Sequence, residues 1–488
     1  MMTIKSSIFK IHRVLGAFLS ILFLMWFVSG VVMMYHTYPK VDKTQALKYA
    51  EVIDTSVVSP LGLQAAVASI DSVSAITLDR RAGMEVFTLT SPKGKALINA
   101  SDGNQKSRYD KDELQEMANR WSDHPACLLD SLYAVDVWLI GSYPFHDYPV
   151  YHYCLPGKDK AELYLSSQTG DALQYTTQES RFWAWVGAIP HWIYIKQFRA
   201  YGRQPWVDIV LWVSGICTIM AITGWIVGLY ACSQARKRGK FTPYQKPWFR
   251  WHHLSGVLFG FFVITWIFSG YMSLKKVPQW LVKVYESRSV QEEIYGKVVP
   301  LEAYRLDYRK ILAGEEVKRL SWLSLGGIPL YKVETDSQIY LVDASIPNKV
   351  EKATIDEAFC QKMMQNVRDK AHIRVEKMED YDNYYISLNR TRPLPVYKIT
   401  VEDSDNSCYY LDPKDGTCIY YNDNTRCRIW LYKGLHCFSC MFFSHHNALR
   451  HGIMWLLLIG GIVVSVTGLF LSFKYIKHRC KEVNTYNT

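Results

Sequence analysis

Four long apolar runs interrupt an otherwise mixed pattern of hydrophobic and polar residues. The first, Val14–Tyr35, has twenty-two residues and no charge, and the others cover about 206–232, 254–274 and 452–473. A helix needs about 20 apolar residues to cross the hydrocarbon core of a bilayer. Each run therefore predicts a membrane-spanning helix. The first run is too long for a signal peptide and is followed by no small-residue cleavage site, so we expect it to remain in the protein.

Between the spans the pattern changes to short alternating runs. Segments such as LYLSSQTGDALQY and YYLDPKDGTCIYY place apolar alternation on either side of Gly-Asp or Asp-Gly turns, which is typical of β-hairpins. Helical stretches at about 61–69 and 355–365 precede such hairpins. Each long segment between spans is thus expected to form a pair of small α+β units.

The predicted organisation has eight parts. They are the N-terminus with the first span (1–36), a first ectodomain (37–205), the second span (206–232), a basic loop (233–251), the third span (252–274), a second ectodomain (275–451), the fourth span (452–473) and a tail (474–488). The expected fold class is a membrane four-helix bundle, built as a tandem helix-ectodomain-helix repeat, with two α+β ectodomains.

The charge distribution orients these parts. The chain has 488 residues and a net charge of +11, and the basic residues gather in the N-terminus, the short loop and the tail. By the positive-inside rule, both termini and the loop face the cytoplasm, and the ectodomains lie outside. The positive net charge is therefore explained by the orientation of the chain in the membrane, and it gives no support to nucleic-acid binding. A cytosolic enzyme, a fibrous chain and a disordered chain are excluded by the apolar runs.

Eight of the eleven cysteines fall on the outer side, where disulfides are permitted. Cys408 and Cys418 flank one hairpin turn and could face each other. Cys437 and Cys440 form a C-x-x-C without a following histidine, so covalent haem attachment is not indicated. The sequence contains neither a nucleotide-binding glycine motif nor H-E-x-x-H, and we assign no catalytic residue.

The two halves of the chain repeat each other. At an offset of 240 the third span matches the first, with His12 on His252 and Gly16 on Gly256. The second and fourth spans match at an offset of 244, and His191 falls near His436 at 245. Each half contains two spans, so the halves should share one orientation about an axis along the membrane normal.

The repeated histidines are the strongest candidates for chemistry. His12 and His252 each precede a glycine by four residues, which leaves a side-chain-free patch one helical turn away, suited to a flat macrocycle. Symmetry places His12 opposite His252, and His191 opposite His436, as axial ligands of two haems at two depths. The alternative is that each histidine is only an interfacial polar residue.

Other residues are secondary candidates. His36 lies at a span end but has no counterpart in the second half. His446 and His451 belong to an outer cluster and could replace His436 as a ligand. Arg13 and His253 occupy matched positions and suit haem propionates.

Several of these motifs resemble the PepSY-associated transmembrane proteins. The pattern H-R-x-x-G opens the first span, PHWIY precedes the second, RWHHLSGVLFG with W-x-x-SG lies in the third, and LHCF precedes SVTG in the fourth. The resemblance covers nearly the whole chain, and the hairpins look like PepSY modules. The paired histidine at 445–446 and the change from Arg13 to His253 depart from a strict repeat.

The resemblance implies a function. Members of the family include bacterial inner-membrane reductases of ferric siderophores, with b-type haems in a four-helix core. It therefore implies an oxidoreductase, with two haem b groups on His12, His252, His191 and His436, that delivers electrons to a periplasmic ferric siderophore or similar chelate. The electron donor would be a quinol or a cytoplasmic reductase, and the helices would lie in membrane lipid. Two rivals are a non-enzymatic, membrane-anchored PepSY binding or regulatory protein and a transporter of an iron chelate.

Overall fold

The structure is a computed structural model, and it describes residues 4–68, 70–139, 147–157, 159–200, 202–369 and 371–486. Its four longest helices are α1 (Ile4–Met33), α8 (Arg203–Arg236), α9 (Pro247–Leu274) and α16 (Asn447–Tyr486). All four are long and apolar enough to cross a membrane, and each covers one of the four apolar runs at which the sequence predicts a helix. Each helix extends beyond its apolar run at one end or both, by thirteen residues at the end of α16 (474–486), because flanking polar residues can continue the backbone hydrogen bonding of the helix.

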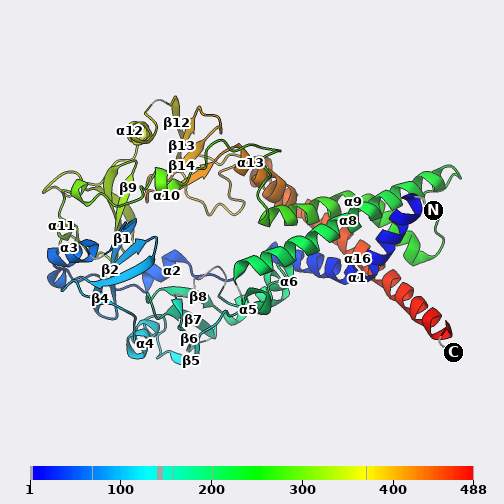
Figure 1. Ribbon diagram of the computed structural model, residues 1–488, viewed down its shortest axis with the longest axis horizontal. Coiled ribbons are helices and arrows are strands. Elements are labelled where there is room, and N and C mark those ends of the chain that lie inside the picture. Colours follow the sequence, from blue (N-terminus) through cyan, green and yellow to red (C-terminus); the bar gives the residue numbers. More distant parts are fainter. Residues whose placement is uncertain are drawn as a thin grey trace.

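The four long helices lie against one another at one end of the molecule, and the sheets occupy the other end (Figure 1). Helix α1 contacts α16 and α8, and α9 contacts α8 and α16. Phe27 of α1, Trp266 of α9 and Leu458 of α16 belong to one apolar core between them. A Cβ at Gly461 would lie only 2.4 Å from the Phe27 ring, so a small residue is needed where these two helices meet.

One sheet joins the two segments that lie between the spans. It contains β1 (Ala75–Arg81), β2 (Met84–Ser91), β3 (Gly94–Asn99), β4 (Gln105–Lys106), β9 (Arg319–Leu325), β10 (Ile328–Glu334) and β11 (Ile339–Asp343). The strand order is β11-β10-β9-β1-β2-β3-β4. Strands β1 and β9 are antiparallel, with Thr77 opposite Ser321. The two segments that the sequence assigns to two ectodomains therefore share the backbone ladder of this sheet.

Two four-stranded sheets complete the α+β architecture. One has the order β5 (Cys127–Leu132), β6 (Val150–Leu155), β7 (Ala161–Ser166) and β8 (Ala172–Thr176), and the other has β12 (Ile373–Met378), β13 (Val396–Val401), β14 (Cys408–Leu411) and β15 (Cys418–Tyr421). Helix α4 (Lys111–Asn119) packs on β6 and β7, and α12 (Glu357–Val367) packs on β12 and β13. Apolar side chains of the seven-stranded sheet enter both cores. The predicted α+β units are confirmed.

Shorter elements connect these parts. They are α2 (Lys43–Lys48), η1 (Thr55–Val57), α3 (Pro60–Ala68), α5 (Gln178–Val186), α6 (Ala188–His191), α7 (Lys196–Arg199), α10 (Val290–Glu293), η3 (Leu301–Ala303), α11 (Arg309–Leu312), α13 (Asp423–Ile429), the π-helix η4 (Trp430–Gly434), α14 (Leu435–Cys437) and α15 (Met441–His445).

The duplication is visible in the element boundaries. Strands β1 and β9 both have seven residues and begin 244 positions apart, and β6 and β13 both have six and begin 246 apart. Helices α4 and α12 also begin 246 positions apart. The two halves therefore fold into the same order of elements, and small insertions account for the change in offset.

The cysteines at the β14–β15 hairpin do not face each other. Cys408 lies opposite Tyr421, and Cys418 lies opposite Leu411, at the two ends of the ladder. The expectation that Cys408 and Cys418 pair across this hairpin is wrong because the connecting turn is too long to place them in register. Both thiols are free.

Candidate functional site

Two pairs of histidines meet where the two halves of the chain come together. The ring centres of His12 on α1 and His252 on α9 are 6.3 Å apart, and their planes differ by 22°. The ring centres of His191 on α6 and His436 on α14 are 6.0 Å apart, at 76°. The four histidines that the sequence repeat singles out are thus brought together in the combination that the repeat predicts.

The inner pair is held by the backbone of neighbouring helices. His12 Nδ1 lies 3.3 Å from the carbonyl oxygen of Met220 on α8. His252 Nδ1 lies 3.2 Å from the carbonyl oxygen of Val464 on α16, and Thr467 Oγ1 is 3.1 Å away. A carbonyl oxygen only accepts, so in both rings Nδ1 carries the proton. The Nε2 lone pair is left available in each ring.

The outer pair is held by the repeated W-x-x-S-G sequence. Ser29 Oγ lies 3.0 Å from His191 Nδ1, and Ser269 Oγ lies 2.9 Å from His436 Nδ1. Each serine hydroxyl donates to the carbonyl oxygen of the tryptophan three residues before it, so it accepts from the imidazole. His436 Nδ1 also lies 3.1 Å from the carbonyl oxygen of Trp266. All four imidazoles therefore share one protonation pattern.

Burial favours the neutral form of both outer imidazoles. Burial lowers the pKa of His191 to about 3, and burial also lowers the pKa of His436. A neutral imidazole that donates Nδ1–H to a protein acceptor is the usual form of a metal-ligating histidine.

The spacing within each pair fits one metal atom between two imidazoles. A ring nitrogen lies about 1.1 Å from the ring centre and a metal–imidazole bond is about 2.0 Å long, so two ligands in line have centres about 6.2 Å apart. The observed separations are 6.3 and 6.0 Å. Two protein ligands alone suit a metal whose other positions are filled by a macrocycle, as in haem.

Two glycines that sequence reasoning did not single out lie against the inner imidazoles. A Cβ at Gly224 on α8 would lie 2.5 Å from His12 Cε1, and one at Gly468 on α16 would lie 3.1 Å from His252 Cε1. Their signal in the sequence is the Thr-Gly dipeptide that the repeat places at both positions. These glycines leave room for the rings themselves.

The predicted glycines have different surroundings. A Cβ at Gly16 would lie 3.6 Å from Met220 Cε, whereas one at Gly256 would meet no atom within 4 Å. The carbonyl oxygen of Gly16 accepts from Ser472 Oγ at 2.9 Å. Only the patch at Gly256 is as open as the sequence argument expects.

Near the inner pair, α1 and α16 enclose a cavity of about 160 Å³. Its lining residues are Ala17, Ser20, Ile21, Leu469, Ser472, Phe473 and Ile476. Its lining includes neither His12 nor His252, and its volume is smaller than that of a porphyrin.

His36 and His446 lie outside the two pairs. The His36 ring stacks on Trp183, with centres 4.1 Å apart and planes 6° apart. His446 is exposed, stacks on Phe442 at 4.6 Å, and places Nδ1 2.9 Å from that residue's carbonyl oxygen. The structure does not bring either ring to His191.

The remaining secondary candidates also have partners of their own. His451 Nε2 lies 2.7 Å from Arg450 Nη2. The guanidinium of Arg13 lies over the ring of Tyr475, 5.2 Å from its centre. His253 Nε2 lies 3.0 Å from the carbonyl oxygen of Gly228, and its buried Nδ1 has no partner among the described residues.

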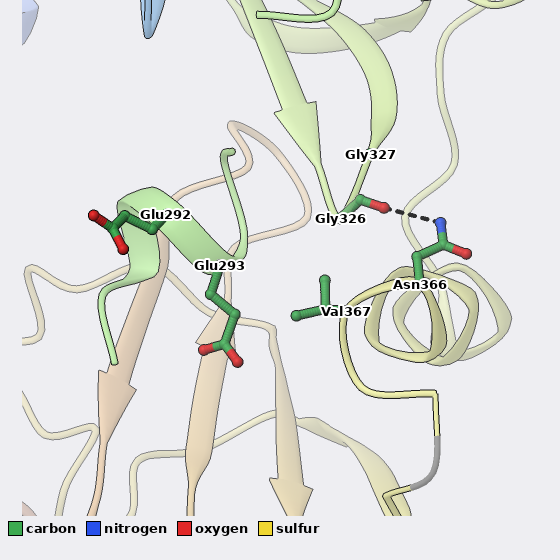
Figure 2. A pocket seen from close by; sticks show the side chains of 6 residues that line it. All are labelled: Glu292, Glu293, Gly326, Gly327, Asn366 and Val367. Carbon is green, nitrogen blue, oxygen red and sulfur yellow. Dashed lines mark hydrogen bonds between the residues drawn. The ribbon is translucent and has the colours of Figure 1, made fainter. Parts of the chain in front are cut away.

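A larger depression lies far from the histidine pairs, on the second four-stranded unit. It has a volume of about 680 Å³ and lies between α10, the β9–β10 turn and the end of α12 (Figure 2). Asn366 Nδ2 donates to the carbonyl oxygen of Gly326 at 2.9 Å. Glu293 forms ion pairs with Arg288 and Arg368. Its charge is therefore already balanced within the protein.

No protein-family model matches the sequence, and no curated protein is significantly similar to it.

Proposed function

We propose that this protein is a membrane haem protein that carries electrons across a bilayer to reduce a ferric chelate outside. The observation that carries the proposal is the pair of matched histidine sites, each with the spacing and Nδ1 partners expected of two axial ligands. The cofactor class is haem b, two per chain, because no C-x-x-C-H is present for covalent attachment. Bound haem supplies reversible one-electron redox chemistry.

The sites lie at two depths, as a relay across the membrane requires. Seventeen residues of α1 separate His12 from Ser29, which contacts the outer pair, and this corresponds to about 26 Å of helix rise. The apolar core that includes Phe23 and Val263 lies between the two levels and would keep water out of this region. The protein thus contributes spacing, ligand orientation and a dry interior.

The proposed membrane and orientation follow from the distribution of basic residues and from the likeness of the sequence motifs to a known family. The positive-inside rule puts both termini and the loop 233–251 in the cytoplasm. The likeness of the motifs to PepSY-associated transmembrane proteins favours the bacterial inner membrane, in a four-helix bundle with periplasmic PepSY-like sheets. The proposed partners are a quinol or cytoplasmic reductase as donor, surrounding lipid, and a siderophore-type ferric chelate as acceptor.

Sealed vesicles test this function. The purified protein is reconstituted with a reductant inside and ferric citrate with a ferrous-specific dye outside. We expect external iron(II) to form with the wild type and to fall to the background rate with His252→Ala, whereas His36→Ala should retain the activity. If iron reduction is absent but iron accumulates inside, the protein is a transporter. If neither occurs, it is a binding or regulatory protein.

A further inference from the structure

Four cationic side chains lie on or near the segment that carries the outer histidine His436. They are Arg392, Arg428, Lys433 and Arg450, and we call them the basic cluster. Lys433 lies in η4, one helical turn before His436, and its carbonyl oxygen accepts from the backbone of Ser439 at 3.1 Å. Arg450 lies in the first turn of α16, is only 7% exposed, and places Nη1 3.5 Å from the carbonyl oxygen of Cys437. The Arg450 guanidinium therefore contacts the turn that carries the outer ligand His436, and Lys433 lies within the helical segment that leads into that turn.

Arg392 reaches this region because its loop is anchored to the outer end of the helices. The loop connects β12 to β13, and Asn383 Oδ1 in it accepts from the backbone of Met441 at 2.9 Å. Asp380 in the same loop lies 2.9 Å from His445 Nε2. The pKa of Lys433 is lowered by burial and by the nearby charges of Arg392 and Arg428, which indicates that these three cations lie close together.

The positive charge of the basic cluster is not balanced by the protein. Within the described ranges, no carboxylate lies within ion-pair distance of any of the four side chains, although the same region contains ion pairs such as Arg426 with Asp423 at 3.1 Å. The guanidinium of Arg392 lies over the ring of Tyr385, and its buried Nη1 has no hydrogen-bond partner among the described residues. A buried guanidinium nitrogen without an acceptor is costly, so an external acceptor would be favourable.

The repeat shows that the fold does not require these charges. At the offset of 245 that matches His436 with His191, Arg428 falls on Trp183 and Lys433 falls on Ala188. The first half thus builds the equivalent helical turn around its histidine with apolar residues. The cations at positions 428 and 433 therefore have no counterpart in the first half.

We propose that the basic cluster binds a carboxylate-bearing anion beside the outer histidine pair. The inference rests on the proposed function and narrows it, because it assigns the substrate to the anionic, polycarboxylate class of ferric chelates. Arginine binds carboxylates in a planar, two-point geometry, and a neighbouring lysine adds a point charge. The same chemistry has a second source in the propionates of an outer haem, and the experiment separates the two.

The test uses gallium(III) citrate, because Ga³⁺ has the charge of Fe³⁺ and nearly its size but is not reduced. Binding to the full chain in nanodiscs is measured by equilibrium dialysis, and the haem content of the same samples is recorded. We expect the Arg392→Gln, Lys433→Gln double variant to bind at least about tenfold more weakly, and wild-type binding to weaken as salt is raised. Lys349→Gln is the matched control, because it removes an exposed lysine that already pairs with Glu351.

The outcomes are distinct. Weaker gallium citrate binding at unchanged haem content assigns the cluster to the chelate, and this result holds even if electron transfer fails. Haem loss in the double variant with unchanged citrate binding assigns it to the propionates. Equal binding and equal haem content in the double variant and the wild type would overturn the proposal. So would an equal loss of affinity for an uncharged gallium trihydroxamate, since charge would then not be recognised. Circular dichroism and thermal unfolding confirm that each variant is folded.

Discussion

Replacing Gly224 by alanine should damage the inner site selectively. The added Cβ would lie 2.5 Å from His12 Cε1 and 2.7 Å from its Nδ1, well inside contact distance. To make room, the imidazole ring of His12 must move, although it is held by the hydrogen bond from its Nδ1 to the carbonyl oxygen of Met220. We therefore expect His12 to leave its position opposite His252.

The magnitude follows from two opposing effects. Overpacking a core position costs about 1–3 kcal/mol, while alanine in place of glycine inside a helix gains about 1 kcal/mol. The net change in the free energy of unfolding for Gly224→Ala should thus be a loss of about 0–2 kcal/mol. At Gly468 the Cβ would lie 3.1 Å from the His252 ring, so a smaller adjustment suffices and the net change should be close to zero.

Gly215 provides the matched control on the same helix. A Cβ there would meet no atom within 4 Å, so Gly215→Ala should stabilise the protein by about 1 kcal/mol through helix propensity alone. The assays are thermal unfolding and the haem-to-protein ratio, which should fall from two toward one in Gly224→Ala only. The reasoning is refuted if Gly224→Ala and Gly215→Ala have the same stability and the same haem content.

Three further predictions follow from the contacts. Ser29→Ala and Ser269→Ala should each weaken haem retention at the outer pair by about 10–100-fold in affinity, because each removes a hydroxyl that accepts from Nδ1 of one outer histidine. Haem release to apomyoglobin measures this, and release rates equal to those of the wild type would contradict it. Leu78→Ala should destabilise the two segments that share the seven-stranded sheet together, by about 2–5 kcal/mol, since Leu78 is fully buried on the strand β1 that joins them. Limited proteolysis tests this, and a second segment that stays resistant to protease in the variant would count against the shared sheet. Burial acts to raise the pKa of Asp171, but Arg81 and Lys95 outweigh it and lower that pKa below its usual value. The stability that this carboxylate contributes is therefore present above about pH 4 and is lost as the pH falls further. Urea unfolding measured from pH 6 to pH 3 should show that the free energy of unfolding declines less steeply for Asp171→Asn than for the wild type. Parallel declines in the two proteins would rule this out.

The sequence was sufficient for the features that depend on local pattern or on the repeat. Apolar length predicted the four long helices, and alternation around turns predicted the α+β units. The repeat predicted which histidines meet, because two equivalent positions in two equivalent halves must be related by the same axis. His12 and His252 are 240 positions apart and still come within 6.3 Å.

Other features needed the structure because no local pattern encodes them. Strands β1 and β9 pair through their outer edges, and the hydrophobic pattern of a strand does not show whether such an edge will pair with another strand or stay free. The acceptor of His12 and one of the two acceptors of His252 are backbone carbonyls, which carry no residue signature. The positions of Cys408 and Cys418 depended on the length of one turn, which shifts the register of the whole ladder.

The haem content and visible spectrum of the purified protein test the central claim most directly. We predict two b-type haems per chain with the low-spin spectrum of two-histidine ligation in the wild type. Replacing any one of His12, His252, His191 or His436 by alanine should lower the ratio to about one, and His36→Ala should leave it at two. A colourless protein, or a spectrum unchanged by all four replacements, would contradict the account.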